Sequence, residues 1–222
     1  MKPAAQAVLP AYQTRFEGRL NCMYCDQKNL VTTGVGHLLD GSPEHSPEPW
    51  LPALRAPWLH SDGSLASRVE VIAEWKNIKH LADMQPGLPK MGGGAYRHFA
   101  TLHLSEIAID TLVDSDAAGM EAYLRKRFVD YDNWPADAQL GILSMSWPMG
   151  PLFYLKYPHF SAAADRLDFA VCAEESAIHG AWYDARNKAH HLCFTNAAAV
   201  LADTATYSPD ALYWPRDLTV AA

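Results

Sequence analysis

Hydrophobic and polar positions along the first part of the chain predict a short helix followed by a β-hairpin. Residues 4–16 are typical of a helix, and Pro10 is expected to start it or to kink it. Apolar and polar residues then alternate over 20–24, a polar turn follows, and β-branched residues return after the turn. Gly34 and Gly36 fall on the second arm of this hairpin, where glycine indicates a bulge or a close approach to the backbone.

The middle of the chain combines loops with one predicted helix. Five prolines between residues 43 and 57 favour a loop, which Trp50 and Trp58 are expected to pack. The glycine run 92–94 lacks the Gly-Lys-Ser/Thr ending of a phosphate loop and predicts a flexible loop instead. The helix between them is expected to be capped by Asp62–Ser64 and to run from Leu65 to about Ala82, with Trp75 on its flank and Glu70 and Glu74 on a solvated face.

The second half of the chain predicts a series of helices. Residues 100–104 alternate like a strand, and Ser105 is a good N-cap for a long helix that ends near Val129. Trp134-Pro135 opens a helix that is apolar almost all round, as a buried helix should be. Two further helices are expected, over 160–175 and 180–200.

Two carboxylates beside the predicted hairpin are the strongest candidates for chemistry. Glu17 stands at the end of the first helix, and Asp26 stands in the hairpin turn. Hydrolysis of a glycosidic bond needs one carboxylic acid to protonate the leaving oxygen and a second carboxylate to activate water or to stabilise the cationic sugar. Thr32, on the returning arm, offers a hydroxyl that could help to hold the water.

The spacing of these residues resembles the active-site segment of the tailed-phage lysozymes, which are muramidases that cut peptidoglycan. The matched positions are Glu17, Gly18, Asp26, Thr32, Gly34, Gly36 and His37, without a gap. The resemblance is strong over 14–39 and weaker but collinear over 105–200. It implies that Glu17 is the general acid and that Asp26 and Thr32 position the attacking water, in an inverting mechanism.

The same resemblance implies supporting residues outside the hairpin. Aligning Ser105 with the family's capping threonine sets Asp116 against the buried aspartate that pairs with the hairpin histidine, here His37. The segment from Trp182 resembles a family segment that faces the cleft, so that Arg186 or Lys188 would approach Glu17. The other supporting position is Gly36, and Pro148 stands where the family usually has a polar residue.

The fold that follows from the resemblance is a lysozyme-like α+β fold. A small N-terminal lobe, residues 1–104, would hold the catalytic hairpin and an extended insertion at about 40–100. Residues 105–222 would form a long connecting helix and a helical C-terminal lobe, with the cleft between the lobes. The family says little about the insertion.

Charge, hydropathy and cysteine content argue against several classes of protein. The chain has 222 residues with a net charge of −7, which argues against nucleic-acid binding, and no apolar run approaches the roughly 18 residues of a membrane span. The start of the chain has no apolar region of a secretory signal. Of the four cysteines, Cys22 and Cys25 form a CxxC pair, which is expected to be free thiols; a zinc site completed by His190, His191 and Cys193 is the less favoured alternative.

These observations predict an enzyme that hydrolyses the β-1,4 bond between N-acetylmuramic acid and N-acetylglucosamine, with no metal or organic cofactor. Its partner is the glycan strand of peptidoglycan. Made in the cytoplasm without a signal, it would act on the cell wall in the periplasm, either as a phage endolysin or as an antibacterial toxin that needs secretion machinery and an immunity protein. The alternatives are a chitinase-like glycosidase and a non-catalytic wall-binding protein on the same scaffold.

Overall fold

The computed structural model describes residues 1–40, 49 and 52–220. The described residues are mostly helical, with a small three-stranded antiparallel sheet, so the predicted α+β class is confirmed at that level. They divide into two compact units. The hairpin unit comprises residues 17–115, and the helical unit comprises residues 1–16 and 116–222.

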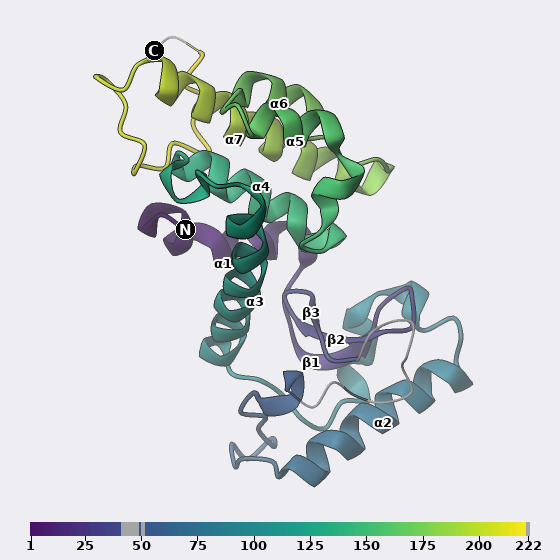
Figure 1. Cartoon of the computed structure of the whole chain (residues 1–222). Coiled ribbons are helices and arrows are strands. Elements are labelled where there is room, and N and C mark those ends of the chain that lie inside the picture. Colours follow the sequence, from purple (N-terminus) through teal and green to yellow (C-terminus); the bar gives the residue numbers. More distant parts are fainter. Residues whose placement is uncertain (41–48, 50–51, 221–222) are drawn as a thin grey trace. The chain divides into compact units, whose positions relative to one another are not determined.

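The hairpin unit is built on the strands β1 (Leu20–Cys25), β2 (Val31–Gly34) and β3 (His37–Leu38), paired in that order (Figure 1). The predicted hairpin is therefore present. Its second arm is not continuous, because the chain turns back between β2 and β3. Gly34 and Gly36, with φ of 62° and 81°, adopt the left-handed conformation that this tight turn requires.

Helix α2 (Arg68–Met84) packs against the strands of the hairpin unit (Figure 1). The prediction of its start was wrong: the cap is Ser67, which forms a reciprocal capping box with Glu70. Asp62 instead accepts hydrogen bonds from Ser64 in the preceding turn, and Leu65 is exposed. The true cap wins because it satisfies two backbone N–H groups at once.

Two predictions for α2 side chains were also wrong. Trp75 is buried rather than on the flank, and Glu74 is buried rather than solvated. Glu74 accepts hydrogen bonds from the backbone N–H and hydroxyl of Thr101, at 2.6 and 2.9 Å, and from the N–H of Leu102 at 3.2 Å. Three donors compensate the cost of burying a carboxylate.

The remaining elements of the hairpin unit are short until the long helix begins. They are η1 (Ala53–Arg55), η2 (Pro89–Met91), η3 (Gly93–His98) and an isolated bridge between Leu59 and His103 where a strand was predicted. The glycine run is not a loose loop, because Gly93 packs directly on β1. Helix α3 (Glu106–Arg127) starts as predicted, with the Ser105 hydroxyl accepting from the N–H of Ala108. Trp58 is buried, and Trp50 lies outside the described residues.

The helical unit contains α1 at its N-terminal end and a run of helices after α3. These are α1 (Pro3–Glu17), η4 (Tyr131–Asn133), α4 (Ala136–Met149), η5 (Phe153–Lys156), α5 (Pro158–Ala164), α6 (Phe169–Glu175), η6 (Ala181–Tyr183) and α7 (Asp184–Ala202). Helix α4 is buried on nearly all sides, as its apolar sequence predicts. Helix α1 does not start at Pro10 but includes it.

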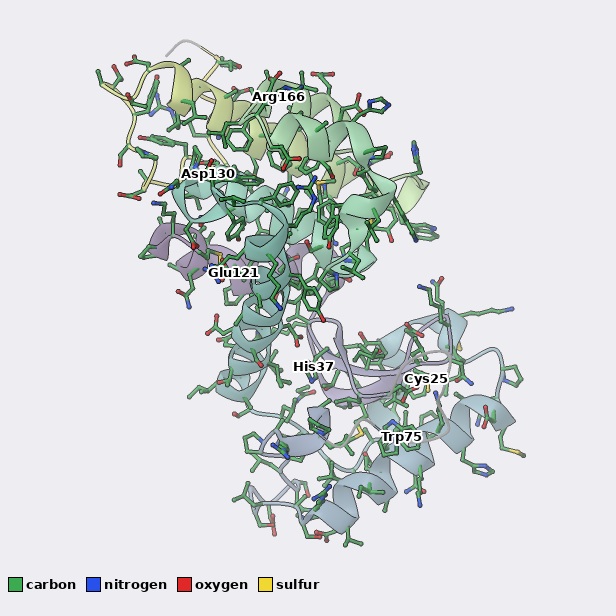
Figure 2. The ribbon with its side chains drawn as sticks, in the orientation of Figure 1. Cys25, His37, Trp75, Glu121, Asp130 and Arg166 are labelled. Carbon is green, nitrogen blue, oxygen red and sulfur yellow. The ribbon has the colours of Figure 1, made fainter. Side chains whose placement is uncertain are left out.

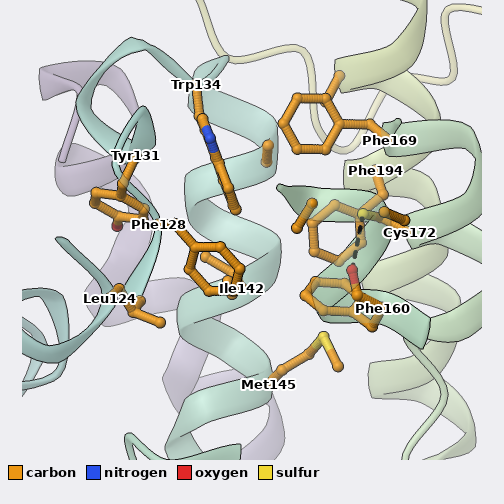
Figure 3. Packing of buried hydrophobic residues seen from close by; sticks show 14 of the residues in the cluster. Leu124, Phe128, Tyr131, Trp134, Ile142, Met145, Phe160, Phe169, Cys172 and Phe194 are labelled. Atoms are coloured by element: carbon orange, nitrogen blue, oxygen red, sulfur yellow. Dashed lines mark hydrogen bonds between the residues drawn. The ribbon is translucent and has the colours of Figure 1, made fainter. Parts of the chain in front are cut away.

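An aromatic cluster forms the core of the helical unit (Figure 3). Trp134 packs edge-on against Phe169 at 5.2 Å between ring centroids, and Phe194 contacts Phe160 at the same distance. The predicted single helix over 160–175 is broken into α5 and α6, because Leu167 adopts a left-handed conformation with φ of 58°. The break lets both Phe160 and Phe169 point into this core.

Candidate active site

Glu17 is the last residue of α1, and the turn after it leads directly into β1. Gly18 has a φ of 74°, a left-handed conformation that ends the helix. Arg19 then fixes the start of β1, since its guanidinium donates to Glu106 at 2.6 Å and to Asp110 at 2.8 Å on α3. The side chain of Glu17 is half-buried, and the backbone that follows it is held to α3 through Arg19.

Asp26 is held by the hairpin turn that follows β1. Its Oδ1 accepts hydrogen bonds from the backbone N–H groups of Lys28, at 2.8 Å, and Leu30, at 2.9 Å. Two bonds to one oxygen fix the orientation of the carboxylate. Within the described part of the chain, no hydrogen bond is made by Oδ2, so that oxygen is available to a water molecule.

Thr32 lies opposite Tyr24 in the β1–β2 ladder, which puts the two side chains on the same face of the sheet. The hydroxyl of Thr32 donates to the carbonyl of Leu30 at 3.2 Å. Its proton is thereby engaged, while its lone pairs can accept a hydrogen bond from water. This arrangement suits a residue that steers water.

Tyr24 is a member of this site that the sequence motif did not single out. Burial raises the pKa of Tyr24, and the negative charges of Glu17 and Asp26 raise it further. The phenol thus stays protonated and lies within the field of both carboxylates. The available signal was its position at the end of the alternating stretch 20–24, two residues before Asp26.

The turn that holds Asp26 is itself clamped by α2. The Lys79 ammonium donates to the carbonyl of Asn29 in the turn and pairs with Asp40 at 2.5 Å. Asp40 also accepts from the indole N–H of Trp75 at 2.7 Å. Asn29 in turn donates its backbone N–H to the carbonyl of Asp26 at 2.9 Å. No local pattern indicates this clamp, because its members lie up to 50 residues apart in the chain.

His37 and Gly36 lie where the hairpin was expected to place them. His37 is buried and is paired with Thr33 in the β2–β3 ladder (Figure 2). Gly36 is exposed at the turn just before it. Asp116 is half-buried in α3 and belongs to the helical unit. Its pairing with His37 stays a prediction.

Arg186 and Lys188, both on α7, have different surroundings. Arg186 is buried, with its guanidinium 5.0 Å from the ring centre of Phe16, the residue before Glu17. It also donates to the carbonyl of Ser144 at 3.4 Å. Lys188 is exposed. Arg186 is therefore not part of a solvated basic patch, and the approach of either residue to Glu17 stays a prediction.

The four cysteines are free thiols and all are buried. Burial raises the pKa of both Cys25 and Cys172 to about 12, so neither is a reactive thiolate at neutral pH. His190, one of the residues considered for a zinc site, instead makes a 2.9 Å hydrogen bond with the Ser144 hydroxyl. Among residues 1–40, 49 and 52–220, no three His, Cys, Asp or Glu side chains gather as metal ligands would.

Comparison with known proteins adds no family to this geometry. No protein-family model matches the chain, and no curated protein matches it. In the described part of the chain, none of the helices has the length and apolar character needed to span a bilayer.

Proposed function

We propose that the protein is a glycoside hydrolase of the lysozyme type, which cleaves the β-1,4 bond between N-acetylmuramic acid and N-acetylglucosamine in peptidoglycan. Glu17 is the general acid that protonates the leaving oxygen. Asp26 is the second carboxylate, and together with Thr32 it holds the attacking water. The family resemblance of the motif from Glu17 to His37 is the origin of this proposal.

The observation that carries the proposal is the hydrogen bonding of Asp26 in the turn and of Thr32 on β2. Asp26 has one oxygen fixed by two backbone N–H groups, and Thr32 has its proton engaged by a carbonyl. Both residues can still accept hydrogen bonds, and a group that binds and deprotonates a water molecule must be a hydrogen-bond acceptor. Besides burial, the negative charges of Glu17 and Asp26 both raise the pKa of one phenol, that of Tyr24.

Glu17→Gln tests the acid assignment, because glutamine keeps the shape of the side chain but has no proton to donate to the leaving oxygen. We expect release of reducing ends from purified peptidoglycan to be abolished while the circular dichroism spectrum is unchanged. The matched control is Glu175→Gln, which removes an exposed carboxylate at the end of α6 and should keep full activity. Hydrolysis by Glu17→Gln above a few per cent of the wild-type rate would refute this role.

Parallel assays separate the other candidate functions. A chitinase-like glycosidase would cleave chitooligosaccharides faster than peptidoglycan. A non-catalytic wall-binding protein would sediment with peptidoglycan and release no reducing ends. Either result would replace the muramidase proposal.

The stereochemistry of the product tests the water-holding role separately. Inversion needs the two carboxyl groups to stand roughly 6.5–9.5 Å apart, with room for the water, whereas a retaining enzyme needs about 5–5.5 Å. We expect proton NMR of a defined β-linked oligosaccharide digest to show the α-anomer first. If the β-anomer appears first, Asp26 is a nucleophile and Thr32 does not steer water.

A further inference from the structure

The hairpin unit contains a cavity of about 620 Å³ beside the start of β1. Neither Asp26 nor Thr32 lines it, and the proposed mechanism does not use it. Its lining comes from the first half of β1, the segment before α2 and the segment that leads from η3 into α3. The polar lining residues are Arg19, Asn21, Ser61, Arg97, Thr101, His103 and Glu106.

The walls of this cavity are held in place by hydrogen bonds from behind. Buried Glu74 accepts three hydrogen bonds from Thr101 and Leu102, which form one wall. The N–H of Leu104 donates to the carbonyl of Asn21 at 2.7 Å and joins this wall to β1. A ligand would therefore meet a surface that is already ordered, which lowers the entropic cost of binding.

Two guanidinium groups, those of Arg19 and exposed Arg97, and the carboxylate of Glu106 line the cavity. The guanidinium of Arg19 is bound by two carboxylates, those of Glu106 and Asp110. Arg97 has no ion pair within the described residues. Its positive charge also acts on the thiol of Cys22: burial raises the pKa of Cys22, and the charge of Arg97 opposes that rise. The guanidinium of Arg97 is therefore the group at this cavity that can form a charge-assisted pair with an anion.

We propose that this cavity binds a carboxylate of the peptide that is attached to muramic acid, with Arg97 as its principal contact. This inference rests on the proposed function. A guanidinium can make two parallel hydrogen bonds to one carboxylate, and Asn21, Ser61 and Thr101 can bond to the amides of a peptide. Such a contact gives an acidic enzyme a local hold on an anionic substrate.

The distance between Glu17, the proposed acid, and the cavity would allow one substrate molecule to contact both. Glu17 and Arg19 are two residues apart, so their Cα atoms are separated by at most about 7 Å. An extended peptide of about three residues spans about 10 Å. A muramic acid placed at Glu17 can therefore extend its peptide to the cavity mouth that Arg19 lines.

Binding of the free stem tripeptide, L-Ala–γ-D-Glu–meso-diaminopimelate, tests the cavity without catalysis. Titration would be followed by NMR shifts in the full-length Glu17→Gln protein. We expect saturable shifts at residues 97–103, and about 10- to 100-fold weaker binding in the Glu17→Gln protein that also carries Arg97→Ala. The control, Arg68→Ala, removes an exposed charge elsewhere in the hairpin unit and should leave the affinity unchanged.

Three results would overturn the inference: no saturable binding of the tripeptide, equal loss of affinity with Arg68→Ala, or binding of inorganic phosphate without binding of the tripeptide. A kinetic arm separates this inference from the proposed function. Arg97→Ala should lower kcat/KM on peptide-bearing glycan but not on glycan stripped of peptide by an amidase. If the wild-type protein hydrolyses neither glycan, the proposed function fails, while the titration still decides the cavity.

Discussion

Lys79→Met removes the cation that ties the Asp26 turn to α2, and it leaves the Asp40 carboxylate buried. The Asp40 side chain is fully buried and that of Lys79 is 19% exposed. Removing one partner of a buried ion pair costs about 3–5 kcal/mol, because the remaining charge is uncompensated. Asp40 keeps its hydrogen bond from Trp75, so we expect the lower end of this range, about 3 kcal/mol, for the hairpin unit.

Hydrogen exchange resolved by residue is the suitable assay, since a chain with two compact units need not unfold in one step. The reporters are the N–H groups of Asn29 and Leu30, which are bonded to Asp26 in the turn. A loss of about 3 kcal/mol corresponds to exchange about 100-fold faster, and amides of α4 in the other unit should be unaffected. Hydrolysis of peptidoglycan should fall through kcat, because the turn positions Asp26 rather than binding the glycan.

Lys76→Met is the matched control, because Lys76 is an exposed lysine on the same helix. It should change the exchange rates by less than a factor of about two, as expected for a surface position. Lys79→Arg should restore most of the protection, since it keeps the charge beside Asp40. If Lys79→Met exchanges at the same rate as Lys76→Met, the clamp does not hold the turn and its assigned role is wrong.

Two further substitutions test packing and protonation. Gly93→Ala would place a Cβ against Leu20 and 2.8 Å from the Tyr24 ring, so we expect urea unfolding to show about 1–3 kcal/mol of destabilisation. The control, Gly94→Ala, places its Cβ in open space and should change the free energy of unfolding little. Equal effects of the two substitutions would contradict the packing of η3 on β1. Burial and the charge of Arg186 lower the pKa of His190 from 6.5 to about 3, so the folded state loses stability as the pH falls below 6.5. Relative to His190→Gln, wild-type stability should fall by about 3 kcal/mol between pH 7 and pH 4, and a constant difference would mean that His190 titrates normally.

Local patterns in the sequence were sufficient to predict several elements of the fold. The hairpin around Asp26, the Ser105 cap and the buried character of α4 are each encoded within one short stretch, by turn residues, by a capping hydroxyl or by a continuous apolar run. The motif also led to the two carboxylates and to Thr32. The hydrogen bonds of Asp26 and Thr32 involve neighbours within four residues, so a local motif suffices to indicate their arrangement, while the catalytic roles of all three residues stay predictions.

Features that depend on distant partners were not predictable in this way. Glu74 has the spacing of a solvated residue, and only the N–H groups of Thr101 and Leu102, 27 and 28 residues away, explain its burial. Glycines 92–94 have a flexible composition, yet Gly93 is required for close contact with Tyr24 on β1. The break between α5 and α6 lies within a continuous helical pattern, and the aromatic residues on either side of it, Phe160 and Phe169, both belong to the core.

The hairpin that carries the motif is stabilised by segments outside the motif, α2 and η3. Strands of six, four and two residues are too short to form a stable hairpin alone, because such a sheet buries little apolar surface. Helix α2 and the segment η3 supply the missing packing, and Lys79 and Gly93 act on the turn and on Tyr24 respectively. A substitution in this segment can therefore impair the proposed chemistry without touching Glu17, Asp26 or Thr32. Residues 53–104 therefore act as positioning elements for the hairpin of the proposed enzyme. Deleting them should unfold the hairpin, because the hairpin would lose the packing of α2 and η3.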